Sequence, residues 1–477
     1  MNAYPELQLC IGGAWKSADG QPTLNPADES VIGTVPRATA GDLDAALDAA
    51  KAGFEIWRKT SPAKRAAIIV EAARLLRERV DEIAFAITLE QGKPLAQSKQ
   101  EILRGCEIIE WDANEGRRLY GRIIPSEPGM RHSVLRQPIG VVAAFSPWNF
   151  PLSSPVRKVA GALSAGCSIV LKASEETPAG AVHLVRAFHD AGLPPGILNL
   201  VFGVPSEISG YLVPRPEVRL VTFTGSIPVG KQLAGLAAQH MKPAIMELGG
   251  HAPVIVCDDV DPTGAGTLSA VAKSRNAGQV CVSPTRFFVH EAIFEPFAAA
   301  FAKRAAAIKV GDGRDPSSDM GPLANHRRLE AMEAFVADAK QKGARVLAGG
   351  SRIGNRGYYF PMTVLAEVPD DARVMSEEPF GPLAVINPVR NIDEAIEKAN
   401  ALPYGLAGYA FTRSANNVDR LAEGVEVGNL SINHFVASSA ETPFGGVKES
   451  GYGREGGTEG LECYSVVKNV SHKQLEG

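Results

Sequence analysis

A short apolar run, Val-Val-Ala-Ala-Phe at residues 141–145, opens a regular alternation of strand-like and helical segments. Comparable apolar runs follow at 168–171, 197–202 and 220–223, and stretches of helical character lie near 178–191, 206–213 and 229–239. A strand buried on both faces is apolar throughout, and two parallel strands need a long crossover between them. The alternation therefore predicts βαβ units and a parallel sheet covered on both faces.

The alternation resumes after the pair Gly249-Gly250, which indicates a second unit of the same kind. Its strand-like runs lie at 253–256 and 287–290, and its helical stretches lie near 262–275 and up to about residue 308. A chain of 477 residues is also too long for one hydrophobic core. We therefore expect an α/β protein with two parallel-sheet domains, and we interpret the glycine-rich stretch 445–457 as a loop.

The N-terminal part is expected to be helical. Apolar residues recur there at spacings of three and four, at Leu43, Leu47, Ala50, Phe54 and Trp57. Asp42 is the expected N-cap of this helix. The pair Ser61-Pro62 predicts a second helix start, because proline is tolerated in a first turn. We expect this second helix to continue through Ile87 to a break at Gly92.

The composition is that of an ordinary globular protein, with 45% hydrophobic and 21% charged residues. A net charge of -4 gives no broad basic surface for nucleic acid. The six cysteines are scattered, form no CxxC pair and show no metal-ligand spacing. We therefore expect free thiols, no bound metal and a reducing compartment.

Membrane and export signals are not expected either. The first six residues lack a basic stretch followed by an apolar one, so we expect no signal peptide. The most apolar run, between Lys158 and Lys172, is too short to span a bilayer. The expected compartment is the cytoplasm.

Two strand ends carry residues suited to a nucleotide. Gly225-Ser226 follows one apolar run and precedes a helix, where a glycine lets the backbone approach a phosphate and the helix N-terminus favours anions. The GxGxxG pattern is absent, so an ordinary strand–helix turn is the alternative. At another strand end, Lys172 could bind ribose hydroxyls, and Glu175 could accept from a ribose while repelling a 2′-phosphate. The alternative there is a solvated charged loop.

One thiol, one carboxylate and one amide lie in segments marked by glycine or proline. Cys281 ends the run Arg-Asn-Ala-Gly-Gln-Val-Cys, Glu247 lies in Met-Glu-Leu-Gly-Gly, and Asn149 lies in Pro-Trp-Asn-Phe-Pro. A cysteine reacts as its thiolate and so needs a base, and a carboxylate at an apolar strand end can have the raised pKa that suits one. These groups could form a thiohemiacetal with an aldehyde and hold its oxyanion. The alternative for Glu247 is a surface residue at a domain boundary.

Two arginines complete the set of candidate residues. Arg157 and Arg275 could bind a carboxylate with their forked guanidinium groups and so select an acidic substrate. Each alone is more often a surface or ion-pair residue. His434 is a weaker base candidate than Glu247, and we expect it to be structural or to line a pocket.

Together these segments resemble the NAD(P)-dependent aldehyde dehydrogenase superfamily over nearly the whole chain. The resemblance is carried by PWNFP, FTGSxxVG, ELGG, GQxC, EEPFGP and PFGGxKxSGxGRE, in this order. Each motif alone is weak, but their co-occurrence is specific. The resemblance implies an aldehyde dehydrogenase-like α/β fold, with two Rossmann-type parallel-sheet domains and a small β oligomerisation element.

The resemblance also implies roles for individual residues. Cys281 matches the nucleophile, and Asn149 together with the Cys281 backbone N–H matches the oxyanion hole. Glu247 matches the base that activates water to hydrolyse a thioester, which argues against a CoA-acylating enzyme. The implied cofactor contacts are Trp148, Lys172, Glu175, Gly225, Ser226, Glu378 and Phe380.

Within the superfamily the chain looks most like the succinate-semialdehyde dehydrogenases. Arg157, Arg275 and Ser438 match the residues that grip the substrate carboxylate there, with Ser439 as an alternative to Ser438. The implied reaction is the NAD-dependent oxidation of succinate semialdehyde to succinate. The same chemistry on 2-oxoglutarate semialdehyde or glutarate semialdehyde is the alternative, since residues 111–118 are similar to those of members that use the oxo-acid. A non-catalytic binding protein is disfavoured because the cysteine and the glutamate are both present.

Coenzyme preference and redox control follow from single positions. Glu175 predicts NAD rather than NADP, because a carboxylate repels the 2′-phosphate, although Ser174 and Lys172 could still reach a phosphate. Some family members carry a second cysteine two residues after the nucleophile, and the residue here is Ser283. No redox-switch disulfide is expected.

The resemblance finally implies a division of the chain and a homodimer or homotetramer. The implied ranges are 1–118 and 141–248 for the NAD-binding domain, 249–435 for the catalytic domain, and 119–140 and 460–477 for the oligomerisation element. In that element, a β-hairpin and the C-terminal tail would pair with a partner subunit.

Overall fold

The apolar runs predicted as parallel strands form the centre of the largest sheet. The structure is a computed structural model that describes residues 4–475, so the outermost ends of the predicted ranges 1–118 and 460–477 lie outside the described residues. The eight strands of this sheet are Leu9–Ile11 (β1), Ala14–Lys16 (β2), Val141–Phe145 (β7), Ser168–Lys172 (β8), Leu198–Val201 (β9), Val218–Gly225 (β10), Ala244–Leu248 (β11) and Gly451–Tyr452 (β19).

The order of these strands creates a switch point. It is β19-β11-β10-β7-β8-β9-β1-β2, with β7 to β11 parallel and the outer strands antiparallel to their neighbours. The chain proceeds from β7 to β8 and β9, and then returns to the other side of β7 as β10. Open α/β sheets bind ligands where the strand order reverses in this way. The carboxyl ends of β7 and β10 are therefore the expected binding edge.

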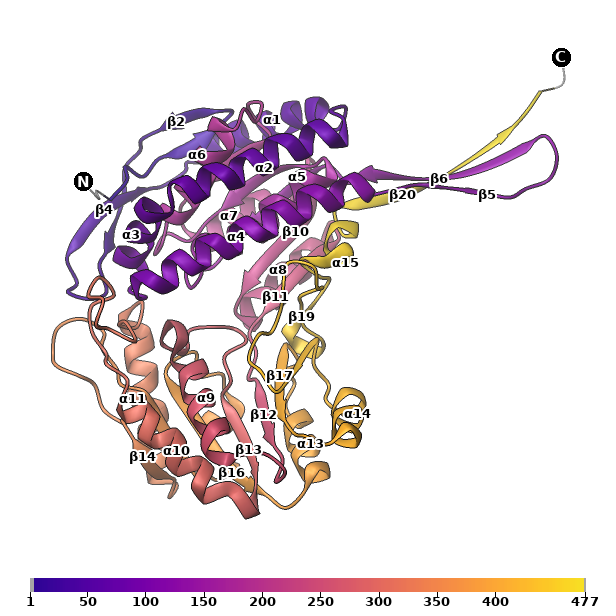
Figure 1. Ribbon diagram of the computed structural model, residues 1–477. Helices are drawn as coiled ribbons and strands as arrows, with labels where there is room; N and C mark the ends of the chain where they lie inside the picture. The colour runs from indigo at the N-terminus through magenta and orange to yellow at the C-terminus, as the bar shows by residue number, and fades with distance from the viewer. Residues whose placement is uncertain (1–3, 476–477) are drawn as a thin grey trace.

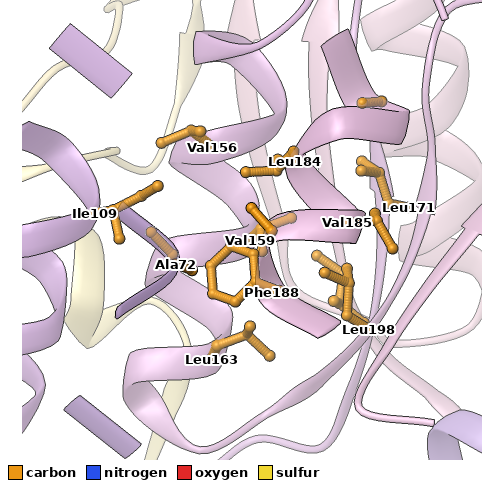
Figure 2. Packing of buried hydrophobic residues seen from close by; sticks show 14 of the residues in the cluster. Ala72, Ile109, Val156, Val159, Leu163, Leu171, Leu184, Val185, Phe188 and Leu198 are labelled. Carbon is orange, nitrogen blue, oxygen red and sulfur yellow. The ribbon is translucent and has the colours of Figure 1, made fainter. Parts of the chain in front are cut away.

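Helices cover both faces of this sheet, as predicted. They are Ala40–Trp57 (α1), Pro62–Glu78 (α2), Val80–Gln91 (α3), Leu95–Glu115 (α4), Gly116–Arg118 (η1), Ser153–Ala165 (α5), Ala179–Asp190 (α6), Pro205–Leu212 (α7) and Ile227–Gln239 (α8). Alternate residues of β7 belong to different clusters: Val142 packs with α2 and α4 to α6, and Ala143 packs with α1, α7 and α8. Figure 2 shows the first cluster, with Phe188 of α6 among Val159 and Leu163 of α5.

The N-terminal helices differ from the prediction in two respects. Asp42 is not the N-cap of α1, because Thr39 holds that position. Asp42 instead completes a capping box, in which its carboxylate accepts from the Thr39 N–H at 2.9 Å and its own N–H donates to the Thr39 hydroxyl at 3.2 Å. The second predicted helix does begin after Ser61, but it breaks at Arg79 into α2 and α3. Asp81 and Glu82 fall in the first turn of α3, where the helix dipole favours acidic residues.

The chain crosses to a second sheet at Gly249-Gly250, between β11 and the next strand. The strands of this sheet are Pro253–Val256 (β12), Arg286–His290 (β13), Arg345–Ala348 (β14), Thr363–Ala366 (β15), Leu383–Val389 (β16), Ala407–Phe411 (β17) and Asn429–Ile432 (β18). Their order is β14-β15-β16-β13-β12-β17-β18, parallel except for β14. This sheet forms the lower lobe in Figure 1. The expectation of a second α/β unit is confirmed.

Helices and short 3₁₀ turns accompany the second sheet. They are Pro262–Ser274 (α9), Arg275–Gly278 (η2), Glu291–Ile293 (η3), Phe294–Ala306 (α10), His326–Gln341 (α11), Arg373–Ser376 (α12), Ile392–Asn400 (α13) and Ala415–Gly424 (α14). The chain then returns to the first lobe. The glycine-rich stretch 445–457, interpreted as a loop, contains a 3₁₀ turn at Lys448–Ser450 (η4) and the edge strand β19, which pairs with β11.

A three-stranded arm projects from the upper lobe (Figure 1). It consists of Arg122–Ile124 (β5), Met130–Pro138 (β6) and Ser465–Lys473 (β20), in the order β20-β6-β5. Ile123 and Val467 are 73% and 61% exposed on it. The remaining elements are Gly20–Leu24 (β3), Val31–Pro36 (β4) and Gly457–Glu462 (α15). Within residues 4–475, no helix combines the length and the apolarity that crossing a membrane requires.

Two helical glycines test how tightly this framework packs. A Cβ at Gly180 of α6 would lie 2.7 Å from the carbonyl carbon and oxygen of Pro151, whereas one at Gly210 of α7 would meet nothing within 4 Å. We expect Gly180→Ala to lower the free energy of unfolding by about 1–3 kcal/mol through overpacking. Gly210→Ala should raise it by about 0.5–1 kcal/mol, because alanine favours the helix. Urea unfolding measures both, and equal effects of the two changes would contradict this packing.

Candidate active site

A cavity of about 550 Å³ lies where the two lobes meet. It is lined in the first lobe by residues at the carboxyl ends of β7, β10 and β11 and by side chains of α4 and α5, and in the second lobe mainly by loops. The predicted site residues that line it are Trp148, Asn149, Arg157, Gly225, Ser226, Glu247, Arg275, Cys281, Glu378, Phe380 and Ser438. Lys172 and Glu175 lie outside its lining, at the end of β8. The thiol, the carboxylate and the amide singled out in the sequence therefore share one cavity.

Cys281 follows a strained stretch of backbone. Asn276, Ala277 and Gly278 have φ values of 49°, 51° and 68°, all in the left-handed region. A non-glycine residue there costs about 1–3 kcal/mol and persists only where its surroundings hold it. Asn276 is held at its N–H, which donates to the Gln97 side chain at 2.8 Å, and at its carbonyl, which accepts from the Gln279 side chain at 3.2 Å.

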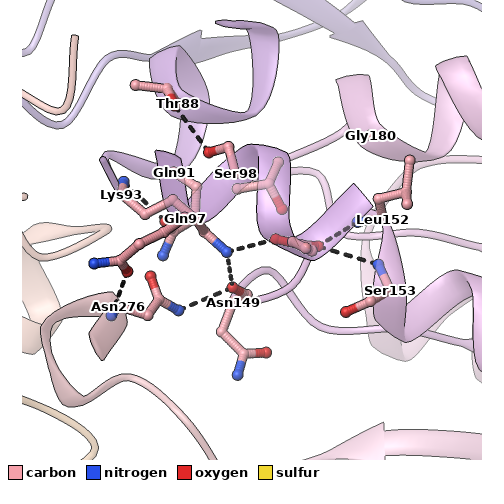
Figure 3. Close-up of polar contacts among 12 residues, drawn as sticks. Thr88, Gln91, Lys93, Gln97, Ser98, Asn149, Leu152, Ser153, Gly180 and Asn276 are labelled. Carbon is pink, nitrogen blue, oxygen red and sulfur yellow. Dashed lines mark hydrogen bonds and ion pairs between the residues drawn. The ribbon is translucent and has the colours of Figure 1, made fainter. Parts of the chain in front are cut away.

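The Asn149 loop is bonded directly to this stretch. The Asn276 side chain donates to the Asn149 carbonyl at 3.0 Å, and the Asn149 amide donates to the Gln279 carbonyl at 3.1 Å. Figure 3 shows Asn276 pointing at Asn149. An amide NH₂ has two N–H groups. The second N–H of Asn149 is therefore left for an oxygen in the cavity.

A buried ion pair supports the same carbonyl from the other side. Lys93 Nζ donates to the Asn149 carbonyl at 2.8 Å and to Glu101 at 2.7 Å, and both side chains of the pair are 1% exposed. The other Glu101 oxygen accepts from the N–H groups of Leu152 and Ser153, at 2.9 and 3.1 Å. The pair thus ties α4 to the start of α5 across the Asn149 loop; Figure 3 labels Lys93, Asn149, Leu152 and Ser153 around it. Neither residue was singled out in the sequence.

Burial sets the protonation of the thiol and the carboxylate. It raises the pKa of Cys281 well above its ordinary value, and the nearby Glu247 carboxylate raises it further. Burial also raises the pKa of Glu247 to about 7, reinforced by Glu455 and opposed by Lys158 and by the Cys281 thiol. One Glu247 oxygen, Oε1, has no hydrogen-bond partner among the described residues. The resting pair is therefore a thiol beside a carboxyl group that ionises near neutral pH.

A second buried ion pair lies behind Glu247. Lys158 donates to Glu455 at 2.6 Å and to the Thr224 hydroxyl at 2.7 Å. Its cation offsets part of the repulsion between the two glutamates. Glu455 is the last residue of the PFGGxKxSGxGRE motif. The motif supported the family resemblance, but no role was predicted for Glu455 itself.

Three arginines gather at another wall of the cavity. Arg157 donates to the Ser438 hydroxyl at 3.3 Å, and its guanidinium lies 4.9 Å from the centre of the Phe444 ring. The guanidinium of Arg275 lies 5.7 Å from the centre of the Phe150 ring. The third arginine, Arg104 of α4, lines the same cavity. Arg104 was not among the residues predicted from the sequence, because no helix was predicted after Gly92.

These arginines lack acidic partners. In the described part of the chain, no carboxylate lies within ion-pairing distance of Arg104, Arg157 or Arg275. Arg157 Nη1 is buried and has no hydrogen-bond partner there. All three arginines are half-buried, and guanidinium groups withdrawn from water are normally paired. An unpaired cluster lining a cavity is suited to bind an anion.

The remaining wall has features that fit a dinucleotide. Ser226 is the N-cap of α8 and makes no side-chain cap, so the N–H groups of Ile227 and Val229 in the first turn are free to meet a phosphate at the switch point, whereas Pro228 has no N–H. Glu378 accepts from the Gly250 N–H at 3.1 Å, and burial raises its pKa to about 8. Trp148 and Phe380 form an edge-to-face pair with ring centres 5.5 Å apart. Phe380 has a φ of 44°, a second strained non-glycine residue at the cavity.

Three other candidate groups lie elsewhere or take other roles. Lys172 and Glu175 form an ion pair with each other at the end of β8. The His434 side chain accepts from the Val436 N–H at 3.1 Å and does not line the cavity. Across residues 4–475, no three His, Cys, Asp or Glu side chains gather in a way that could hold a metal ion.

The Lys93–Glu101 pair gives a stability prediction. Lys93→Met leaves the Glu101 charge buried and unpaired, so the free energy of unfolding should fall by roughly 3–5 kcal/mol. The double variant Lys93→Met, Glu101→Gln should lose less, because glutamine still accepts from the start of α5 and carries no charge. Urea unfolding compares the two variants. A single variant as stable as the parent would refute a supporting role for the pair.

Comparison with known proteins agrees with this geometry. The model of the aldehyde dehydrogenase family matches residues 15–470. The chain is 47% identical to 4-(hydroxymethyl)benzenesulfonate dehydrogenase TsaD1 of Comamonas testosteroni, over 97% of each chain. It is 40% identical to succinate-semialdehyde dehydrogenase [NADP(+)] GabD of Escherichia coli (strain K12), over 97% of this chain and 96% of that one. The crystal structure of succinate-semialdehyde dehydrogenase from Burkholderia pseudomallei superimposes with a TM-score of 0.96, at 40% identity and 98% coverage of both chains. The resemblance seen in the sequence is confirmed, and the chain belongs to the aldehyde dehydrogenase family.

Proposed function

We propose that this protein oxidises an aldehyde with an anionic tail to the corresponding acid, using NAD, and that succinate semialdehyde is the leading substrate. One observation carries the proposal: a thiol, a carboxylate and an amide share a cavity with a cluster of arginines that lack acidic partners. Glutarate semialdehyde and 2-oxoglutarate semialdehyde are alternatives, since arginines bind the tail and not the chain that joins it to the aldehyde.

The chemistry begins with the thiol. Glu247 accepts the proton of Cys281, and the sulfur attacks the aldehyde carbon to form a thiohemiacetal. The second N–H of Asn149 and the Cys281 backbone N–H stabilise the oxyanion. NAD, when bound, supplies the acceptor for the hydride that leaves this carbon, so that a thioester remains on Cys281. Glu247 then deprotonates water, which hydrolyses the thioester. One aldehyde, one NAD⁺ and one water give one carboxylate, one NADH and two protons.

The choice of coenzyme rests on residues of this chain, because GabD is named for NADP(+). Glu175 would accept a hydrogen bond from the adenosine ribose and repel a 2′-phosphate. Lys172, which forms an ion pair with Glu175, would bind the same ribose. Gly225 and Ser226 would approach the pyrophosphate, and Glu378, Trp148 and Phe380 the nicotinamide end.

A sulfonate-bearing aldehyde is the second candidate. Two observations favour it: TsaD1 is named for a benzenesulfonate, and Arg104 adds a third guanidinium to Arg157 and Arg275. A sulfonate carries one charge, as a carboxylate does, but three oxygens. Both candidates share the same reaction at Cys281 and differ in the tail alone.

Assembly, domain division and compartment are also proposed. The arm of β5, β6 and β20, with its exposed Ile123 and Val467, would pair with a partner subunit in a homodimer or homotetramer. The two large sheets support an NAD-binding domain at 1–118 and 141–248 and a catalytic domain at 249–435. All six cysteines are free thiols, which supports the cytoplasm as the compartment.

A substrate panel tests the proposal. Each anionic aldehyde and its uncharged counterpart, such as butanal for succinate semialdehyde, is assayed with NAD and with NADP. The anionic aldehyde should have the higher kcat/KM by roughly 10- to 100-fold, because hydrogen bonds to charged groups contribute about 1.5–3 kcal/mol. NAD should be preferred. Equal kcat/KM for butanal would refute tail recognition, and a clear NADP preference would refute the role of Glu175.

The pKa of Glu247 predicts a pH profile. The base is the ionised form, and the pKa is raised to about 7, so activity should rise with pH up to about 7 and fall roughly ten-fold per unit below it. Glu247→Gln should lower kcat by about 10²–10⁴-fold and abolish this limb of the profile. Steady-state rates across the pH range measure both effects. An acid limb that persists in Glu247→Gln would assign the titration to another group.

A further inference from the structure

Arg104 extends the anion site beyond the residues indicated by the sequence. It lies on α4, whereas Arg157 lies on α5 and Arg275 begins η2. All three line the cavity together with Ser438. The three arginines therefore reach the cavity from three separate elements.

The charges of this cluster are not compensated within the protein. Burial lowers the pKa of Arg104, and the cations of Arg275 and Arg157 lower it further. Glu107 acts on Arg104, and Asp112 and Glu247 act on Arg157, only from beyond ion-pairing distance. Burial raises the pKa of Asp112 to about 8, so this carboxyl group is largely neutral at pH 7. An anion from outside is the missing counter-charge.

Several N–H and O–H groups of this cluster make no hydrogen bond within the described residues and could donate to such an anion. Arg104 uses one nitrogen, Nη2, to donate to the Ser438 carbonyl and, at 3.3 Å, to the Ser438 hydroxyl. Its Nε and Nη1 make no bond among residues 4–475. Arg157 Nη1 is also without a partner. The Ser438 hydroxyl accepts from Arg104 and from Arg157, so its own proton is free to be donated.

The number of donors favours one tail geometry. A carboxylate is planar, and one guanidinium fork occupies both of its oxygens. A second guanidinium and a hydroxyl can then donate to the remaining lone pairs of the carboxylate. No carboxylate oxygen is left to accept from a third guanidinium. A sulfonate presents three oxygens around its axis. We infer that Arg104 is a specificity-determining residue that binds the third oxygen of a sulfonate-type tail. This inference rests on the proposed function and names the residue by which its second candidate, the sulfonate-bearing aldehyde, would be recognised.

A matched pair of aldehydes tests it. 4-Sulfobenzaldehyde and 4-carboxybenzaldehyde share the ring, the reach and the charge of the tail and differ in the number of tail oxygens. Arg104→Gln should lower kcat/KM for the sulfonate about 10-fold or more, mainly through KM, and for the carboxylate by less than about 3-fold. Arg104→Lys keeps the charge and loses the fork, so its kcat/KM for the sulfonate should lie between those of the parent and of Arg104→Gln. Lys99→Gln removes an exposed cation from the same helix and should leave kcat/KM unchanged for both substrates.

Binding measurements separate recognition from folding. Calorimetric titration of benzenesulfonate and benzoate should show that Arg104→Gln selectively weakens the sulfonate, with NAD binding unchanged. Equal losses for both anions, or no loss for either, would overturn the role of Arg104 and leave the proposed oxidation standing. Oxidation of benzaldehyde but of neither anionic aldehyde would instead refute the proposed function, and this inference with it.

Discussion

The carbonyl oxygen of Asn149 is the junction on which the site depends. It accepts from Lys93, which leads into α4, and from Asn276, which belongs to the strained stretch before Cys281. These two side chains come from opposite lobes and meet at one atom. A fixed carbonyl also restrains the Asn149 side-chain amide. The proposed oxyanion hole requires this, because its donors must be in place before the reaction. The buried Glu101 completes the junction by bonding the start of α5.

Burial gives the same cavity two electrostatic regions of opposite character. Around Cys281, burial raises the pKa of Glu247 and of Glu378. Burial raises the pKa of the Cys281 thiol as well, so the thiol stays protonated until a base acts. At the tail wall, arginines cannot lose their protons in this way and remain unpaired cations. The proposed aldehyde with an anionic tail would satisfy both regions, since its tail would neutralise the cations and its carbonyl would meet the nucleophile.

Much of the fold could be predicted because its signals are local. The apolar runs that begin at Val141–Phe145 predicted strands buried on both faces. The pair Gly249-Gly250 indicated where the chain crosses between the sheets. The α4 helix was missed, although Ile102, Cys106, Ile109 and Ala113 recur at helical spacing and are buried. That omission hid Arg104 and Glu101 as well. Their roles depend on contacts with residues far along the chain, which no local pattern reports.

The candidate site was predicted from sequence motifs more than from the physical properties of single residues. Cys281, Glu247 and Asn149 were recognisable because each stands in a glycine- or proline-marked segment, and the structure places all three at one cavity. By contrast, Lys93 and Lys158 stand in no motif that marks them in the sequence. They become meaningful only when burial removes their water and leaves Glu101 and Glu455 as partners.

Covalent capture of the acyl group tests the central claim most directly. Glu247→Gln is mixed with NAD and succinate semialdehyde, quenched in acid and analysed by peptide mass spectrometry. The account predicts a succinyl thioester on the peptide that contains Cys281 and none on the other five cysteines. Coenzyme reduction without any adduct on Cys281, or with the adduct on another cysteine, would contradict it.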